Sequence, residues 1–351
     1  MAGRVREMTG EQRLLAACRR ESVDSTPVWF MRQAGRCLEE YRELRKRYDM
    51  LTLAKTPELA AQVTSMPIEA LGVDGAVIFA DIMLPMESMG APFVIEPEVG
   101  PIIHDPVRSA ADVARLRIVD AEESTPYVFE AIRLTRQRLG SRAALIGFSG
   151  APFTLACYLV EGRPSRDFPH TKALMFGEPA VWNQLMDTLV EVIIRYLRGQ
   201  IAAGAQVIQL FDSWVGALAP SDYEEYVLPH SKRIFDAVRA TGVPSIHFGT
   251  GNSGMLEQMA AAGCDLVSVD WRVPLDEAWG RIGDRGIHGN LDPTMLLAPY
   301  AVAEAGAADV LRRAAGRSGH VFNLGHGVLP ATAPDALKRL VDFVHESTSG
   351  T

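Results

Sequence analysis

The sequence has little of what marks metal-binding, disulfide-rich or membrane-spanning proteins. Its four cysteines are scattered without C-x-x-C spacing, which indicates a reducing, cytoplasmic location rather than a disulfide framework or a zinc knuckle. It has no run of about 18 apolar residues and no apolar core at its N-terminus, so we expect neither a membrane span nor a signal peptide. The formal net charge of −8 argues against a general surface for nucleic acid or anionic membranes. Any anion site must therefore depend on local positive charge.

Short apolar runs, in contrast, recur along the chain, and each is followed by a helical pattern. The eight runs are, in order, PVWFM, GAVIFAD, ALIGFSG, QVIQLFD, PSIHFG, DLVSVD, GIHGN and HVFNLGHG. They are apolar almost throughout, as expected when both faces of a parallel strand are buried. No linker rich in Pro, Gly or Ser divides the chain. We therefore predict an α/β fold, a single-domain (β/α)8 barrel of the TIM type over residues 1–351, with a flexible N-terminus at residues 1–8.

In such a barrel, the residues at the C-terminal ends of the strands converge on one face, and the active site lies there. The predicted set combines arginine, carboxylate, histidine and glycine, but it has no metal-binding trio of recognisable spacing. None of the five lysines follows a strand, so Schiff-base chemistry is not expected. We expect no metal site. The strand-end residues are Arg32, Arg36, Asp81, Phe148, Gly150, Phe211, Asp212, Ser213, His247, Gly249, Asp270, Asn290, Asp292, Gly325 and His326.

One glycine pattern imitates a dinucleotide-binding motif. The stretch HFGTGNSG places Gly249, Gly251 and Gly254 in a G-x-G-x-x-G pattern after a strand, and Asp270 ends the next strand. Such a motif normally opens its domain, whereas here four strand–helix units precede it. We favour the alternative that these glycines let a loop pass close to a bulky ligand.

The stretch PVWFMRQAGR, Pro27 to Arg36, ends an apolar run in two arginines. A solvated helix face explains Arg47 further along the chain, but it does not explain Arg32 and Arg36 at the end of a strand. A guanidinium is always charged and meets a carboxylate through two parallel hydrogen bonds. The two arginines therefore predict a site for an anionic ligand.

Six motifs carry a resemblance to a known family. PVWFMRQAGR, FADIMLP, GFSGAPFTLACYLVEG, QLFDSWVGAL, HFGTGNSG and FNLGHGVLP, in this order, resemble the uroporphyrinogen decarboxylase family over nearly the whole chain. The resemblance implies a cofactor-free carboxy-lyase, usually a cytoplasmic homodimer. It would remove the carboxyl groups from the four acetate side chains of uroporphyrinogen III and give coproporphyrinogen III in haem biosynthesis. Cys37 and Glu39 stand where the family commonly has an aromatic residue and a proline.

The resemblance also implies roles for individual residues. Asp81 would accept hydrogen bonds from the pyrrole N–H groups and stabilise a cationic ring, which is electrostatic preorganisation. Arg32 and Tyr158 complete the candidate catalytic set; with His326 they are the candidate proton donors, although arginine is a poor acid by its pKa. The implied substrate contacts are Arg32, Gln33, Ala34, Gly35, Arg36, Asp81, Tyr158, Ser213 and His326, with Phe79, Phe148 and Phe211 as apolar walls.

Plainer explanations stay open for several of these residues. Asp81 and Ser213 are also typical of helix N-caps. His326 lies between Gly325 and Gly327, so it could brace loops or belong to a phosphate site.

Two other functions also stay open for the chain. The first is a zinc-dependent corrinoid or thiol methyltransferase on the same type of barrel. Such an enzyme needs a His-x-Cys pair, whereas Gly249 follows His247 at the cysteine position and Cys264 alone is not enough. The second is a tetrapyrrole-binding protein without activity, which the full set of arginine, aspartate, tyrosine and histidine disfavours.

Overall fold

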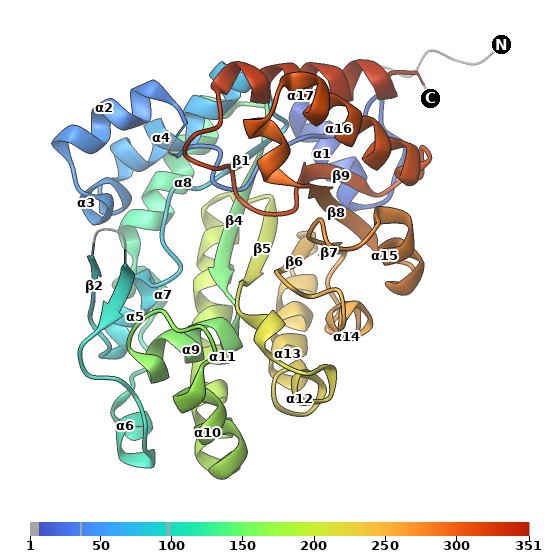
Figure 1. Ribbon diagram of the computed structural model, residues 1–351. Helices are drawn as coiled ribbons and strands as arrows, with labels where there is room; N and C mark the ends of the chain where they lie inside the picture. The colour runs from blue at the N-terminus through green and yellow to red at the C-terminus, as the bar shows by residue number, and fades with distance from the viewer. Residues whose placement is uncertain (1–6, 36, 97–98, 351) are drawn as a thin grey trace.

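A curled sheet of seven parallel strands, in the order β1-β4-β5-β6-β7-β8-β9, forms the centre of the computed structural model (Figure 1). The structure describes residues 7–35, 37–96 and 99–350. The strands are β1 (Gly75–Val77), β4 (Ala144–Gly150), β5 (Val207–Asp212), β6 (Ser245–Gly249), β7 (Leu266–Ser268), β8 (Gly286–Leu291) and β9 (His320–Leu324). Each strand pairs in parallel with the next. The barrel-type α/β fold and the order of its runs are therefore confirmed.

The first apolar run, PVWFM, joins the two edges of this sheet but does not form a full strand. Val28 makes an isolated parallel bridge with Phe322 of β9, and its carbonyl accepts the N–H of Asp74, next to β1, at 2.7 Å. Trp29 N–H still donates to the carbonyl of Phe322, at 3.4 Å. The two amides after it bond to side chains: Phe30 N–H donates to Gln33 Oε1 and Met31 N–H to Asn323 Oδ1. Because these side chains take the place of ladder carbonyls, the expected strand ends after a single bridge.

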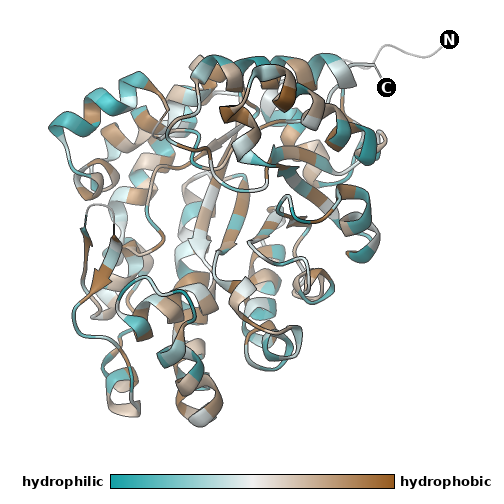
Figure 2. Ribbon diagram, in the orientation of Figure 1, coloured by the Kyte–Doolittle hydropathy of each residue, from teal (hydrophilic) through white to brown (hydrophobic). Residues whose placement is uncertain are grey.

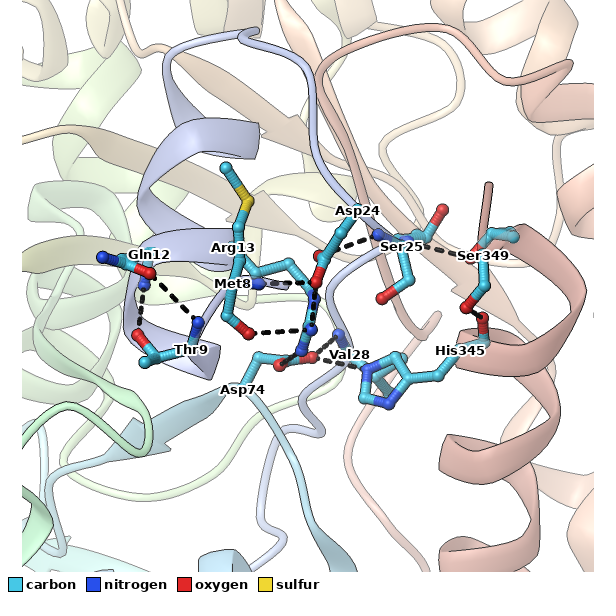
Figure 3. A network of polar contacts seen from close by, with 12 residues as sticks. Met8, Thr9, Gln12, Arg13, Asp24, Ser25, Val28, Asp74, His345 and Ser349 are labelled. Carbon is cyan, nitrogen blue, oxygen red and sulfur yellow. Dashed lines mark hydrogen bonds and ion pairs between the residues drawn. The ribbon is translucent and has the colours of Figure 1, made fainter. Parts of the chain in front are cut away.

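Asp74 fixes this junction at the end of the barrel where β1 begins (Figure 3). Its Oδ2 accepts the N–H of Val28 and a bond from His345 Nε2, each at 2.8 Å, and its Oδ1 pairs with Arg13 at 2.6 Å. Arg13 also pairs with Asp24 at 2.6 Å. Helices from both ends of the chain are thereby tied to the segment that joins the sheet edges.

Helices follow the strands and cover the outside of the sheet. Their inner faces are apolar, as in the 25-residue α11, whose N-terminal residue is a proline and whose C-cap is Gly204. The helices that flank the barrel are α1 (Gly10–Cys18), α4 (Pro57–Leu71), α8 (Pro126–Leu139), α11 (Pro179–Ala203), α13 (Leu228–Arg239), α14 (Leu256–Ala261), α15 (Leu275–Arg281), α16 (Tyr300–Ala314) and α17 (Pro334–Thr348).

Shorter elements occupy the connections. An antiparallel hairpin of β2 (Phe93–Glu96) and β3 (Gly100–Ile103) follows the first strand, and the sequence patterns did not predict it. Helix α2 (Glu39–Arg47) is largely hydrophilic in Figure 2, in accord with the solvated face expected around Arg47. The others are α3 (Met50–Lys55), α5 (Leu84–Met89), α6 (Ala110–Arg115), α7 (Ala121–Ser124), α9 (Pro152–Glu161), α10 (Pro169–Gly177), α12 (Pro220–Tyr226) and the 3-10 helices η1 (Val215–Ala217) and η2 (Pro293–Leu297).

Over the described part of the chain, no helix combines the length and apolar character that a membrane crossing requires. Of the predicted flexible N-terminus, residues 1–6 lie outside the described residues. Met8 donates its N–H to Asp24 at 2.8 Å.

Candidate active site

The turn that follows Val28 presents Arg32 at the mouth of the barrel. Its backbone is left-handed, with φ of 61°, and its side chain is exposed. The buried Gln33 holds the turn: its Oε1 accepts the N–H of Phe30 at 2.8 Å and its Nε2 donates to the carbonyl of Gly75 at 2.7 Å. The amide of Gln33 is thus engaged with backbone, Ala34 is buried, and Gly35 N–H donates to the carbonyl of Arg32. Arg36 lies outside the described residues.

Asp81 lies in the loop after β1 and is half-buried. The prediction that it ends the strand was wrong, because β1 stops at Val77 and three loop residues separate the two. Its Oδ1 accepts the N–H of Met83 at 2.8 Å just before α5. One carboxylate oxygen therefore caps the loop, in partial agreement with the helix-cap alternative. Burial raises the pKa of Asp81, while the Met83 amide and the positive charge of Arg32 oppose that rise.

Tyr158, on α9, faces the same group of charges. Burial raises the pKa of Tyr158 to about 12; the negative charge of Asp81 adds to the rise and Arg32 opposes it. Its ring lies 5.9 Å from that of Trp214, which in turn lies 5.5 Å from Phe168. Trp214 follows Ser213 after β5, and its backbone N–H donates to Thr154 Oγ1 on α9. This bond ties the backbone of Trp214 to the helix that carries Tyr158.

His326 follows β9 and is also half-buried. Burial lowers the pKa of His326, and the positive charges of Arg32 and Arg272 lower it further, while Asp270 raises it. The imidazole is therefore neutral near pH 7. Its two glycine neighbours have packing reasons, because a Cβ on Gly325 would lie 2.6 Å from Trp271 N and a Cβ on Gly327 would lie 2.7 Å from Arg32 Cδ. Close packing is enough to account for these glycines.

Aromatic rings line the inside of the barrel below these polar groups. Phe148 lies 5.3 Å from Phe211, Phe211 lies 5.3 Å from Phe248, and Phe248 lies 6.2 Å from His326, measured between ring centroids. The expected walls from Phe148 and Phe211 are thus adjacent, and Phe248 joins them. Phe79 instead pairs with Tyr41 of α2 at 5.7 Å.

Two of the strand-end residues do not point into the mouth. His247 adjoins Phe248 in β6, so the two side chains lie on opposite faces of the strand. The ring of His247 packs on Phe235 of α13 at 5.0 Å, and Asp212 accepts a bond from Thr154 Oγ1 of α9 at 3.0 Å. The prediction that Asp212 and His247 converge on the mouth was therefore wrong.

Asn290 near the end of β8 and Asp292 just after it are engaged in loop structure. Asn290 Nδ2 donates to the carbonyls of Asp270 and Val273, and Asp292 Oδ1 accepts the N–H of Thr294 at 2.9 Å. We assign neither Asn290 nor Asp292 a role in the site.

The G-x-G-x-x-G pattern is a loop of the barrel. Asp270, which a dinucleotide site would need for a ribose, accepts the N–H of Gly251 at 2.7 Å and pairs with Arg272 at 2.7 Å. Gly249 is the last residue of the barrel strand β6, between β5 and β7. The dinucleotide alternative is not supported.

The charge of Arg32 thus reaches Asp81, Tyr158 and His326, and the charge of Asp81 also reaches Tyr158. Ser213 lies half-buried next to Trp214, and its carbonyl accepts the hydroxyl of Thr250. Sequence reasoning missed Trp214, Phe248 and Gly327. All three lie within quoted motifs, directly beside residues that were predicted.

The mouth of the barrel thus combines arginine, carboxylate, phenol and imidazole groups above an aromatic wall. Such a set is typical of an enzyme site for an anionic ligand that contains rings.

The family described as "Uroporphyrinogen decarboxylase (URO-D)" matches residues 9–347. The chain belongs to this family. It is 55% identical over 334 residues to the uroporphyrinogen decarboxylase of Sorangium cellulosum, covering 95% of each chain. It is 52% identical over 336 residues to that of Carboxydothermus hydrogenoformans, covering 95% of this chain and 96% of the other.

Among solved structures, a methyltransferase from Methanosarcina mazei has the same fold, with a TM-score of 0.80 at 22% identity, over 97% of this chain and 99% of that one. This likeness concerns the fold alone. Within residues 7–35, 37–96 and 99–350, no three His, Cys, Asp or Glu side chains gather as a metal site would require. Cys264 is fully buried. The zinc methyltransferase alternative is therefore not favoured.

Proposed function

We propose that the chain decarboxylates the four acetate side chains of uroporphyrinogen III to give coproporphyrinogen III, a step of haem biosynthesis. The observation that carries the proposal is the meeting of Arg32, Asp81, Tyr158 and His326 over an aromatic wall in a chain of this family. No step of the proposed reaction draws on a cofactor.

Arginine binds the carboxylates of the substrate, which carries eight around its ring of pyrroles. Arg32 is exposed in the mouth, and a guanidinium can meet a carboxylate in a two-pronged contact. Arg36 is assigned the same role from the sequence alone. Each contact is worth about 1–4 kcal/mol at effective dielectric constants of 80 to 20. Gln33, Ala34 and Gly35 belong to the same turn; Gln33 supports its shape through the two backbone bonds of its amide.

Asp81 stabilises the positive charge of the reacting ring. Protonation of the pyrrole carbon that bears the acetate gives a cationic ring, which accepts the electrons of the breaking C–C bond. Oδ1 of Asp81 accepts the Met83 amide, and that bond fixes the orientation of the carboxylate so that Oδ2 can accept pyrrole N–H groups. A preorganised charge at this point lowers the barrier for each of the four rings in turn.

Tyr158 and Arg32 complete the catalytic set, with Ser213 and His326 as substrate contacts. The pKa of Tyr158 is raised to about 12, so the phenol keeps its proton at neutral pH and is available to donate it. Arg32 is a poor acid on its own, and its part is to hold the reacting carboxylate or to relay a proton. The lowered pKa of His326 makes its imidazole a neutral hydrogen-bonding group.

We also propose that the protein is a cytoplasmic homodimer. The four cysteines are all free and buried, a state that suits a reducing compartment. The dimer is inferred from the family resemblance, and its mass in solution, measured by light scattering, tests it. A monomer at micromolar concentration would contradict it.

The activity is tested by anaerobic incubation with enzymatically made uroporphyrinogen III. Products are oxidised and separated by their number of carboxyl groups. We expect species with seven, six and five carboxyl groups and then coproporphyrin, without added metal or cofactor. Unchanged substrate would refute the proposal, and binding without turnover would favour a carrier of tetrapyrroles.

A further inference from the structure

Gly327 forms part of the surface on which the side chain of Arg32 rests. An ideal Cβ built on Gly327 would lie 2.7 Å from Cδ, 2.9 Å from Cγ and 3.3 Å from Cβ of Arg32. Contacts between carbons are optimal at about 3.5–4.0 Å, so three consecutive stem atoms of the arginine occupy the space that any side chain at position 327 needs. The contact is therefore made by the stem and leaves the guanidinium outside it.

Backbone bonds hold the two segments in this register. Val328 N–H donates to the carbonyl of Met31 at 2.9 Å, directly beside the contact between Gly327 and Arg32. Arg32 itself has a left-handed backbone, with φ of 61°, which a non-glycine residue adopts at a cost of about 1–3 kcal/mol unless its surroundings enforce it. The turn cannot simply rotate to make room for a larger residue at position 327.

We infer that Gly327 is a positioning residue for Arg32: the absence of its side chain lets the arginine stem lie flat on the loop after β9, and so aims the guanidinium across the mouth towards Asp81 and Tyr158. The effect of this position on the reaction rate rests on the proposed function. Gly327 itself touches no substrate in this scheme. A shift of about 1 Å in a positioning group can cost about 10²-fold in rate, so the contact sets the geometry of the site.

The test uses Gly327→Ala, Arg32→Ala and the double variant, with two matched glycine controls. A Cβ at Gly280 meets no atom within 4 Å, so Gly280→Ala, inside helix α15, should leave activity unchanged and raise stability slightly. A Cβ at Gly199 would lie 2.5 Å from Phe129 Cζ, far from these loops, so Gly199→Ala, inside helix α11, measures the effect of overpacking away from the site. We expect Gly327→Ala to lower kcat/KM by about 10²-fold and the melting temperature by a few degrees. Arg32→Ala in the same chain should restore the melting temperature.

A second readout does not depend on activity. NMR of labelled histidine measures the pKa of His326. Burial and the positive charges of Arg32 and Arg272 lower this pKa, and Asp270 raises it, so a change in the position of Arg32 should change it. The pKa of His326 should rise in Gly327→Ala, rise in Arg32→Ala, and rise no further in the double variant. It should stay unchanged in Gly199→Ala even though that variant is less stable.

The outcomes separate this inference from the proposed function. If the pKa and the stability follow the expected pattern but no variant, nor the parent chain, decarboxylates the substrate, the positioning holds and the proposed function fails. If the pKa of His326 in Gly327→Ala equals that of the parent chain, or if the double variant remains as unstable as Gly327→Ala, then Arg32 does not rest on Gly327 and the inference is overturned.

Discussion

Replacing Asp81 by asparagine is the sharpest test of the proposed chemistry. The change keeps the size of the side chain and one acceptor oxygen, and that oxygen can retain the 2.8 Å bond from the Met83 amide. It removes the negative charge and places an N–H₂ group where the pyrrole N–H donors would bind. The fold should therefore survive, and the loss should fall on catalysis.

The magnitude follows from Coulomb's law. A unit charge about 4 Å from a cationic ring contributes about 1 kcal/mol at the dielectric constant of water and about 4 kcal/mol at an effective value of 20. Asp81 is half-buried beneath the mouth, which places it between these limits. Since each 1.36 kcal/mol is a tenfold change in rate, we expect Asp81→Asn to slow turnover by about 10²-fold. Asp81→Glu keeps the charge but displaces it, and should retain more activity.

Asp292 supplies a matched control for the helix-cap alternative. Like Asp81, it is half-buried and follows a barrel strand, and its Oδ1 accepts the N–H of the residue two positions later, at 2.9 Å. If capping were the whole function of Asp81, the two asparagine variants should behave alike. We expect Asp292→Asn to keep turnover within about twofold, in line with a small effect away from the chemistry.

The direction in which Asp81→Asn changes the stability of the fold follows from the pKa of Asp81. Burial raises the pKa of Asp81 in the folded protein, so the folded state binds this proton more tightly than the unfolded state does. Stability therefore falls as the pH rises from the ordinary aspartate pKa through the raised one, and it remains lower at neutral pH. Asparagine has no charge to lose, so the variant should melt at the same temperature or higher at pH 7, and the difference should shrink in acid.

The assay measures every acetate step under anaerobic conditions, with products separated by carboxyl number. One central anion serves all four rings, so Asp81→Asn should slow every step in parallel. Stalling at a single intermediate, or turnover equal to that of Asp292→Asn, would refute the role assigned to Asp81.

Four further outcomes are expected. Arg36→Ala should lower kcat/KM by an amount equivalent to about 2–4 kcal/mol of transition-state stabilisation. Arg47→Ala, on the solvated face, should cost less than about 0.5 kcal/mol. Equal losses in steady-state kinetics would contradict the assignment of Arg36 to the substrate site and of Arg47 to the solvated face. Metal analysis should find no stoichiometric zinc and chelators should leave activity unchanged, whereas one zinc per chain that is lost on changing His247 would restore the methyltransferase alternative. Burial lowers the pKa of His288 from 6.5 to about 3. Between these two pH values the unfolded state binds more protons than the folded state, so the melting temperature should fall as the pH drops from 6.5 towards 3. The fall should be less steep in His288→Gln. Asp74→Ala removes the acceptor of the buried Val28 amide and one of the two carboxylates that pair with Arg13, so it should lower the free energy of unfolding by about 1–3 kcal/mol in denaturant titrations.

Sequence periodicity predicted most of the fold because parallel barrel strands are buried on both faces. Seven of the eight apolar runs became strands in the predicted order. The run around Val28 did not, since its pairing is replaced by bonds to the side chains of Gln33 and Asn323. The bond between Met31 and Asn323 joins residues far apart in the chain, and no local pattern records it.

The site was predicted less completely, for a related reason. The position of a residue at a strand end is local information, but the face on which its side chain lies depends on strand register. Asp212 and His247 were assigned to the mouth on position alone, and the alternation along β6 turns His247 towards α13 instead. The role of Gly327 could not be predicted either, because it depends on contact with the side chain of Arg32, which lies nearly three hundred residues earlier in the chain.

Two aspartates on either side of β1 show how the barrel divides stability from chemistry. Asp74 precedes the strand, and its carboxylate is engaged by Arg13, Val28 and His345. Asp81 follows the strand, and within the part of the chain that the structure describes its carboxylate accepts one hydrogen bond, from Met83. A partly buried carboxylate with few donors costs stability, and the raised pKa of Asp81 records that cost. At the mouth, substrate N–H groups can supply the donors that the carboxylate of Asp81 lacks. At the other end of β1, the carboxylate of Asp74 already has its donors from the protein, and it holds the barrel together.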